Sequence, residues 1–163
     1  MRILGIDPGL QITGYGVIDY APANPLRPKL LDGGVIRLKS RLSIADRLVE
    51  LERELEELLQ EHRPDICAVE QLYSHYKHPR TAILMGHARG VILMVAARQG
   101  VRVEQFAANR IKQVLTGYGH AGKQQMQRAI QAQWNLKKLP EPADVADAIA
   151  VALCCGAAVA SRV

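Results

Sequence analysis

Four acidic residues stand where their carboxylates could act together in chemistry. Asp7 follows the apolar run RILGI, and Glu70 follows the apolar run ICAV. Asp144 and Asp147 are three residues apart at the start of a predicted helix, so they share one face of it. Taken singly, each acid has an ordinary structural explanation as a turn residue, a strand exit or a helix cap. Together, they could meet at one end of a sheet if the two strands are neighbours.

A cluster of this kind favours metal-dependent phosphoryl transfer. Carboxylates placed close together repel one another unless a multivalent cation lies between them. Oxygen ligands suit Mg²⁺, with Mn²⁺ as its substitute, and two ions about 4 Å apart could stabilise both the attacking and the leaving oxygen. We therefore predict two ions per site, and we predict these catalytic residues and metal ligands: Asp7, Glu70, Asp144 and Asp147.

The elements that must position these acids follow from hydrophobic periodicity. Apolar runs punctuated by glycine predict strands over 2–7, 12–20, 30–39, 65–70 and 101–106. Helical spacing begins at Ser43, and further helices are predicted over 79–99, 108–115, 122–134 and 143–160. This order predicts an α/β fold with a mixed sheet flanked by helices, formed as a single domain over residues 1–163.

Charge is distributed unevenly along the chain, whose formal net charge is +5. Residues 43–62 hold seven acids and two basic residues, which fits a solvated helix that lies away from any polyanion. Residues 71–138 hold eleven Lys and Arg against one acid, Glu104. A one-sided positive field of this kind suits nucleic acid, because each neutralised phosphate releases counterions.

The segment QLYSHYKHPR after Glu70 interleaves aromatic residues with cations, which suits unstacked bases and phosphates. It predicts DNA contacts by Tyr73, Tyr76, Lys77 and Arg80, although a polar surface loop with packed tyrosines remains the alternative. The same segment contains His75 and His78. We do not predict these as metal ligands, and their roles stay open.

Other patterns narrow the class of protein. The chain opens directly on a strand, without a secretory pattern, and the apolar stretch Ala148–Ala160 is shorter than a membrane span. Cys67, Cys154 and Cys155 lack zinc-site spacing, which favours free cysteines in a reducing, cytoplasmic compartment. Residues 117–123 have the spacing of a nucleotide phosphate loop, but Gln124 replaces the required Ser or Thr. We therefore expect no membrane contact and no nucleotide cofactor.

Several segments, taken in order, resemble the RuvC-type Holliday-junction endonucleases of the ribonuclease-H-like superfamily. The matching segments are ILGIDPGLQITGYGVI, AVEQLY, GHARGVI, RIKQVLTGYGHAGKQQM and ADVADAIAVA. They span nearly the whole chain. The resemblance implies a ribonuclease-H-like fold with a mixed five-stranded sheet.

The resemblance also implies roles for individual residues. Asp7 and Glu70 match the family's first catalytic acids, and Asp144 and Asp147 match the closing acidic pair. Some members have histidine at the position of Asp144, so no histidine proton shuttle is expected there. Tyr73 matches an aromatic residue at the junction centre, and Lys112 and Lys123 match basic residues that contact DNA near the cut.

The resulting hypothesis is an endonuclease that resolves four-way DNA junctions in recombination and repair. Paired symmetric nicks would leave 5′-phosphate and 3′-hydroxyl ends. The resemblance implies a Mg²⁺-dependent homodimer that works with a branch-migration helicase in bacteria, at the nucleoid. The apolar 83–97 helix could form the dimer contact or simply pack in the core.

Two alternatives stay open, and a third is disfavoured by the length of the chain. A related nuclease of the same fold could act on structured RNA, or the chain could be a non-catalytic junction-binding module. Actin-like sugar kinases share the opening motif, but they need two such domains, and 163 residues cannot supply both. Cleavage of RNA, junction binding without cleavage, or ATP binding would distinguish these alternatives from a junction-resolving endonuclease.

Overall fold

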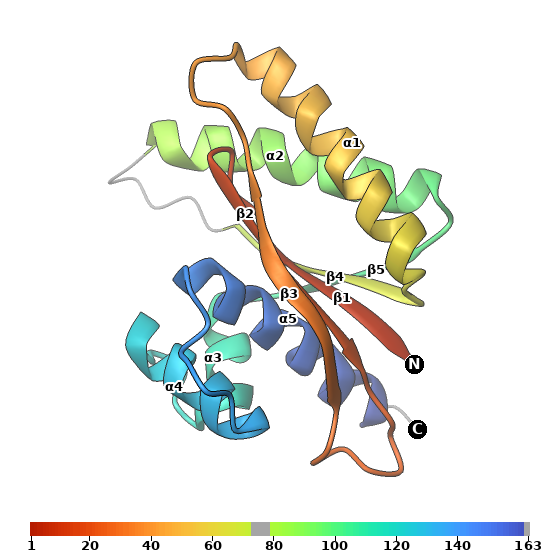
Figure 1. Cartoon of the computed structure of the whole chain (residues 1–163), viewed down its shortest axis with the longest axis vertical. Coiled ribbons are helices and arrows are strands. Elements are labelled where there is room, and N and C mark those ends of the chain that lie inside the picture. Colours follow the sequence, from red (N-terminus) through yellow and green to blue (C-terminus); the bar gives the residue numbers. More distant parts are fainter. Residues whose placement is uncertain (73–78, 162–163) are drawn as a thin grey trace.

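The computed structural model describes residues 1–72 and 79–161 (Figure 1). Within these ranges, the strands and helices follow one another in the predicted order, and their boundaries differ from the predicted ones by at most two residues. The strands are β1 (Arg2–Asp7), β2 (Ile12–Asp19), β3 (Lys29–Arg37), β4 (Ile66–Glu70) and β5 (Arg102–Phe106). The helices are α1 (Ile44–His62), α2 (Pro79–Arg98), α3 (Ala108–Thr116), α4 (Lys123–Trp134) and α5 (Ala143–Ala160).

The five strands form one mixed sheet in the order β3-β2-β1-β4-β5. The first three strands are an antiparallel meander, whereas β1, β4 and β5 run parallel to one another. Parallel neighbours end at the same edge of a sheet, so β1 and β4 deliver their last residues to one place. The predicted mixed five-stranded sheet flanked by helices is thereby confirmed.

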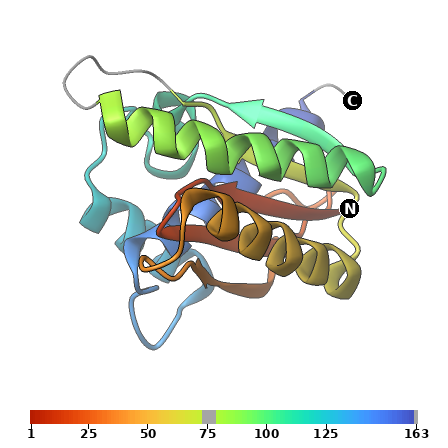
Figure 2. The same ribbon diagram turned by 90° about the horizontal axis from the view of Figure 1, so that it is seen from above.

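Helices cover both faces of the sheet. Figure 2 shows α1 and α2 side by side on one face, and α5 lies on the other face with α3 and α4 packed around it. On the first face, α1 contributes Leu51, Leu55 and Leu59 to the core. Its acids lie outside this stripe, and Arg98 at the end of α2 pairs with two of them, Glu52 at 2.7 Å and Glu56. As predicted, α1 is an acidic outer helix.

The helix α5 lies unusually close to the sheet because small residues line the contact. A Cβ atom added at Gly5 of β1 would lie 2.6 Å from the backbone nitrogen of Ala152, and one added at Gly16 of β2 would lie 2.9 Å from the Cα of Ile149. Such distances are below van der Waals contact. Only glycine at these strand positions allows α5 to pack at this depth.

Within the part of the chain that the structure describes, two helices, α2 and α5, are long and apolar enough by length and composition to cross a membrane. In α5, the apolar character is explained by its position, since 61% of the apolar window is buried against the sheet and neighbouring helices. The apolar part of this helix extends beyond the stretch that the sequence pattern identified.

Candidate active site

Asp7 and Glu70 meet at the carboxyl ends of two adjacent strands. Ile6 of β1 pairs in parallel register with Val69 of β4, which places the following residues, Asp7 and Glu70, side by side. Side chains alternate along a strand. Gly5 of β1 faces α5, so Asp7 emerges on this same face of the sheet. The strand-end prediction thus describes the observed arrangement of these two acids.

The first turns of α5 bring the remaining two acids to the same edge. The turn that contains Asp144 rests on Gly14 of β2, where an added Cβ atom would lie 2.6 Å from the carbonyl carbon of Asp144. Gly14 is the antiparallel partner of Asp7. Asp147 follows about one turn further along α5. The helix therefore starts beside Asp7, and both of its acids are half-buried there.

A cavity of about 220 Å³ lies between the acids and two lysines. It is bounded by Asp7, Glu70 and Asp147 on one side and by Lys112 of α3 and Lys123 of α4 on the other. Apolar residues close the cavity: Ala108, Ile111 and Met126. Asp144 does not line it, although its charge acts on Asp7. The structure therefore brings together five of the predicted site residues and holds Asp144 at the margin.

Burial and mutual repulsion disfavour the charged forms of these acids. The pKa of Asp7 is raised to about 8, first by burial and then by the charges of Glu70, Asp147 and Asp144. The pKa of Glu70 is raised to about 7, again by burial first and then by Asp147. Burial also raises the pKa of Asp147. Lys123 opposes the shifts at Asp7 and Asp147, and Lys112 opposes those at Glu70 and Asp147.

This donor set fits a hard divalent cation. All the acidic groups offer oxygen ligands, and a cation among them would relieve the repulsion that raises their pKa values. Among the residues that the structure describes, no three His, Cys, Asp or Glu side chains already stand close enough together to enclose an ion. The acids surround a space, and ligation would require small side-chain movements toward its centre.

The cluster makes metal-free stability depend on pH. An unfolded carboxyl titrates at about pH 4, so between pH 4 and pH 8 the folded protein, with raised pKa values at Asp7 and Glu70, holds more protons than the unfolded chain. Stability must then fall as pH rises through this window. We expect the melting temperature in chelator to drop by roughly 10 °C or more between pH 5 and pH 8.5, and Mg²⁺ to restore it at pH 8.5. A melting temperature that rises over this range in chelator would contradict the arrangement.

The loop before Lys123 does not form a nucleotide phosphate site. A phosphate loop joins a strand to a helix. Here, residues 117–122 join α3 to α4, with Gly117 ending α3 in the left-handed conformation at φ 75°. The loop instead sets Lys123 at the first position of α4, where it faces Asp7 and Asp147.

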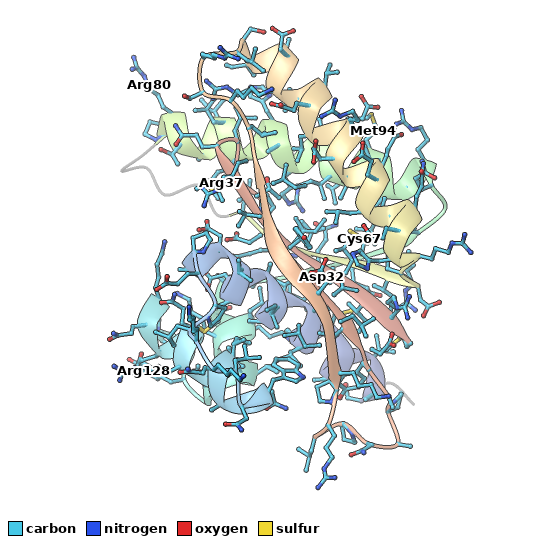
Figure 3. All side chains as sticks on the ribbon, viewed as in Figure 1. Asp32, Arg37, Cys67, Arg80, Met94 and Arg128 are labelled. Atoms are coloured by element: carbon cyan, nitrogen blue, oxygen red, sulfur yellow. The ribbon has the colours of Figure 1, made fainter. Side chains whose placement is uncertain are left out.

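The predicted DNA contacts of the segment after Glu70 mostly lie outside the described residues. This applies to Tyr73, Tyr76 and Lys77, and also to His75 and His78. Arg80 is described and lies exposed in the first turn of α2, outside the lining of the acidic cavity. Figure 3 shows its side chain extending outward from the end of α2.

Arg89 supports the site, and residue-by-residue reasoning on the sequence did not identify it. From the middle of α2, its Nε donates to the backbone carbonyl of Glu70 at 3.3 Å. The same guanidinium also donates to the side chain of Gln105 on β5. It therefore ties the ends of two parallel strands together where Glu70 leaves the sheet. In the sequence, Arg89 stood out only through its position in GHARGVI, one of the segments that resemble the family.

A larger cavity, of about 670 Å³, lies at the opposite end of the sheet. It is lined by residues 59–60, 63–65 and 99–101, among which Asp65 is the single acid. A site for phosphoryl transfer needs several converging ligands. This cavity does not provide them, so the smaller acidic cavity is the candidate active site.

The strand order, the central helix α5 and the acidic cavity at the ends of β1 and β4 define a protein of the ribonuclease-H-like class. A family model described as "Crossover junction endodeoxyribonuclease RuvC" matches residues 3–155. The chain belongs to this family of endodeoxyribonucleases.

Relatives in sequence support the same assignment. A crossover junction endodeoxyribonuclease RuvC of Rhodopirellula baltica is 52% identical over 152 residues, which cover 93% of this chain and 84% of the relative. The protein of the same description from Alkaliphilus oremlandii is 44% identical, with coverage of 94% and 92%. The similarity thus extends over almost the full length of both partners.

Solved structures agree with the fold. The Thermus thermophilus RuvC structure matches with a TM-score of 0.86 at 31% identity, over 99% of this chain and 97% of the other. T. thermophilus RuvC in complex with Holliday junction substrate matches with a TM-score of 0.89 at 31% identity, over 99% and 96%. The yeast mitochondrial resolvase Ydc2, at 13% identity and a TM-score of 0.65, shares the fold alone.

Proposed function

We propose that this chain resolves four-way DNA junctions by cutting phosphodiester bonds in a metal-dependent reaction. The observation that carries the proposal is the cavity in which Asp7, Glu70 and Asp147 face two lysines, within a chain of the RuvC family. The family is metal-dependent. A relative of the same fold has been solved with a Holliday junction, which favours a junction over structured RNA as the substrate.

Asp7, Glu70, Asp144 and Asp147 would hold Mg²⁺, with Mn²⁺ as its substitute and two ions per site. When bound, the ions would stabilise the negative charge on the attacking and leaving oxygens of an in-line displacement. The protein's own residues then have separate tasks. Asp7 and Glu70 present oxygens from rigid strand ends, and Asp147 approaches from α5. The cuts leave a 5′-phosphate and a 3′-hydroxyl.

Lys112 and Lys123 would receive the phosphate that is cut. Both line the acidic cavity, each on a different helix, and their charges oppose those of the acids. A phosphate that enters the cavity would therefore meet cations on the side away from the strands. Arg80, Lys77, Tyr76 and Tyr73 would contact the junction arms and the bases at its centre.

We propose a homodimer, because paired symmetric nicks in a junction of approximate two-fold symmetry need two related sites. The helix α2 has two distinct faces. Ala88, Ile92, Val95 and Ala96 are buried against the sheet, which bears out ordinary core packing for that face. Ile83 and Met94 are 60% and 47% exposed. They lie eleven residues apart, or about three turns, so they share the outer face that would meet the second copy.

The biological setting follows from the proposed activity. A junction-resolving nuclease acts in recombination and repair and meets its substrate at the bacterial nucleoid, in the cytoplasm. Branch migration by a helicase would supply junctions at preferred positions. The cysteines fit this compartment, because Cys67, Cys154 and Cys155 are buried thiols that form no disulfide among the described residues.

The decisive experiment is cleavage of a labelled synthetic four-way DNA junction, with a linear duplex of the same sequence as control. Paired nicks near the branch point that require Mg²⁺ and vanish in chelator are the expected result. Tight binding without cutting in Mg²⁺ or Mn²⁺ would instead indicate a binding module. Cutting of a structured RNA in preference to the DNA junction would indicate the RNA-directed alternative.

A further inference from the structure

The end of β3 places an arginine on the catalytic face of the sheet, on the side opposite the two lysines. Asp7 of β1 pairs with Gly14 of β2, and Gly14 pairs with Val35 of β3. Arg37 is two residues beyond Val35, where it ends β3 and pairs with Ile12. Two strand spacings across and two residues along the strand put its Cα about 12 Å from that of Asp7.

The direction of Arg37 follows from the alternation of side chains along β3. Gly33 faces α5, since a Cβ atom added there would lie 3.3 Å from Ile149, whereas Ile36 belongs to the core under α1 and α2. Arg37 therefore projects on the side of Gly33, which is also the side of Asp7. Figure 3 shows Arg37 at the end of β3, above the start of α5. The guanidinium thus flanks the site beside the turn that contains Asp144.

The backbone around Arg37 is held in place by the turn that follows Asp7. The backbone nitrogen of Leu38 donates to the carbonyl of Gln11 at 3.0 Å. The hydroxyl of Thr13, at the start of β2, donates to the carbonyl of Gly9 in that turn at 2.6 Å. Arg47 of α1 donates to the carbonyl of Leu42 at 3.2 Å and so fixes the chain that leaves β3. Arg37 is therefore presented by the same rigid unit as Asp7.

The side chain of Arg37 is exposed and has no ion pair or hydrogen bond within residues 1–72 and 79–161. Two other basic residues nearby are engaged within the protein. Lys39 pairs with Glu50 at 3.4 Å, and Arg47 is bound to backbone carbonyls. A free cation beside a phosphate-cutting site suits a phosphate of the backbone, which a guanidinium can bind with two hydrogen bonds.

We propose that Arg37 binds a DNA backbone phosphate next to the one that is cut, on the Asp144 side of the site. The distance of about 12 Å between the Cα atoms of Arg37 and Asp7, together with the reach of the arginine side chain, suits a phosphate close to the cut one on the same strand. Lys112 and Lys123 hold the cut phosphate from the other side. This inference rests on the proposed function and adds a strand-positioning contact to it.

The test compares Arg37→Gln with Arg27→Gln. Arg27 is also exposed and lies two residues before β3 begins, at the opposite end of this strand from Arg37, and both variants lose one charge. Binding of a four-way junction is measured in chelator, which prevents cutting, over a series of salt concentrations. We expect Arg37→Gln to weaken binding about 3- to 10-fold and to reduce the slope of log affinity against log salt by about 0.9. Arg27→Gln should leave the slope unchanged, and Arg37→Lys should restore most of it.

Equal slopes for the wild-type protein and Arg37→Gln would overturn the inference while leaving the proposed function intact. Absence of junction binding by the wild-type protein would overturn the proposed function and this inference with it. Because the side chain of Arg37 makes no described contact, the melting temperature of Arg37→Gln should match that of the wild-type protein, which separates a lost DNA contact from a folding defect.

Discussion

Asp7→Asn is expected to bind four-way junctions and to lose cleavage by at least about 1,000-fold. Asp7 has the most strongly shifted pKa of the cluster and stands between Glu70 and the acids of α5. Asparagine keeps the shape of the side chain but removes the charged oxygen that a cation needs. It also removes repulsion from the cluster, so the metal-free variant should melt at the same temperature as the wild-type protein or above it.

The measurement is single-turnover cleavage at saturating protein, with binding followed separately in chelator. Asp65→Asn is the matched control, since Asp65 is exposed at the opposite end of the sheet and an amide oxygen can still accept the 2.7 Å hydrogen bond from the backbone nitrogen of Arg2. This control should cut at the wild-type rate. Substantial cutting by Asp7→Asn would show that cleavage does not require the Asp7 carboxylate.

Gly5→Ala is expected to destabilise the protein by about 3 kcal/mol or more, although it adds a single methyl group. The added carbon would collide with the backbone of Ala148 and Ala152, which cannot rotate away as a side chain could. Relief requires α5 to shift outward, and Asp147 would move with the helix. Urea unfolding monitored by circular dichroism gives the free energy, and cleavage by the folded fraction reports the displacement.

Gly86→Ala provides the control for this substitution. Gly86 lies within α2, and an added Cβ atom there would meet none of the residues that the structure describes within 4 Å. Alanine in a helix interior is favoured over glycine by roughly 0.5–1 kcal/mol, so this variant should be as stable as the wild-type protein or slightly more stable. Similar losses for both variants would show that α5 does not depend on the glycine contact.

Much of the architecture could be predicted because it depends on patterns local to each segment. Apolar runs that end in an acid predicted both the strands and the positions of Asp7 and Glu70. The adjacency of these strands could not be derived from their residues alone. It depends on the parallel pairing of β1 with β4, two segments that are far apart in the sequence, and the family resemblance supplied it instead.

Other features depend on distances that sequence spacing does not contain. Asp144 and Asp147 looked equivalent from their spacing, yet only Asp147 lines the cavity, because Asp144 lies in the turn that rests on Gly14. Arg89 acts across the fold on the ends of β4 and β5. The position of Arg37 beside the site depends on the pairing of β3 with β2. None of these contacts produces a periodic pattern in the sequence from which it could be predicted.

The acidic outer face of α1 has a consequence for how the protein reaches DNA. Seven acids are concentrated in residues 43–62, whereas the cations Arg37, Lys112 and Lys123 lie around the open edge of the sheet. This separation gives the molecule a charge dipole. The electric field of DNA therefore orients the protein before contact and disfavours an encounter in which α1 faces the DNA. Salt would then slow productive association, and not only weaken the finished complex.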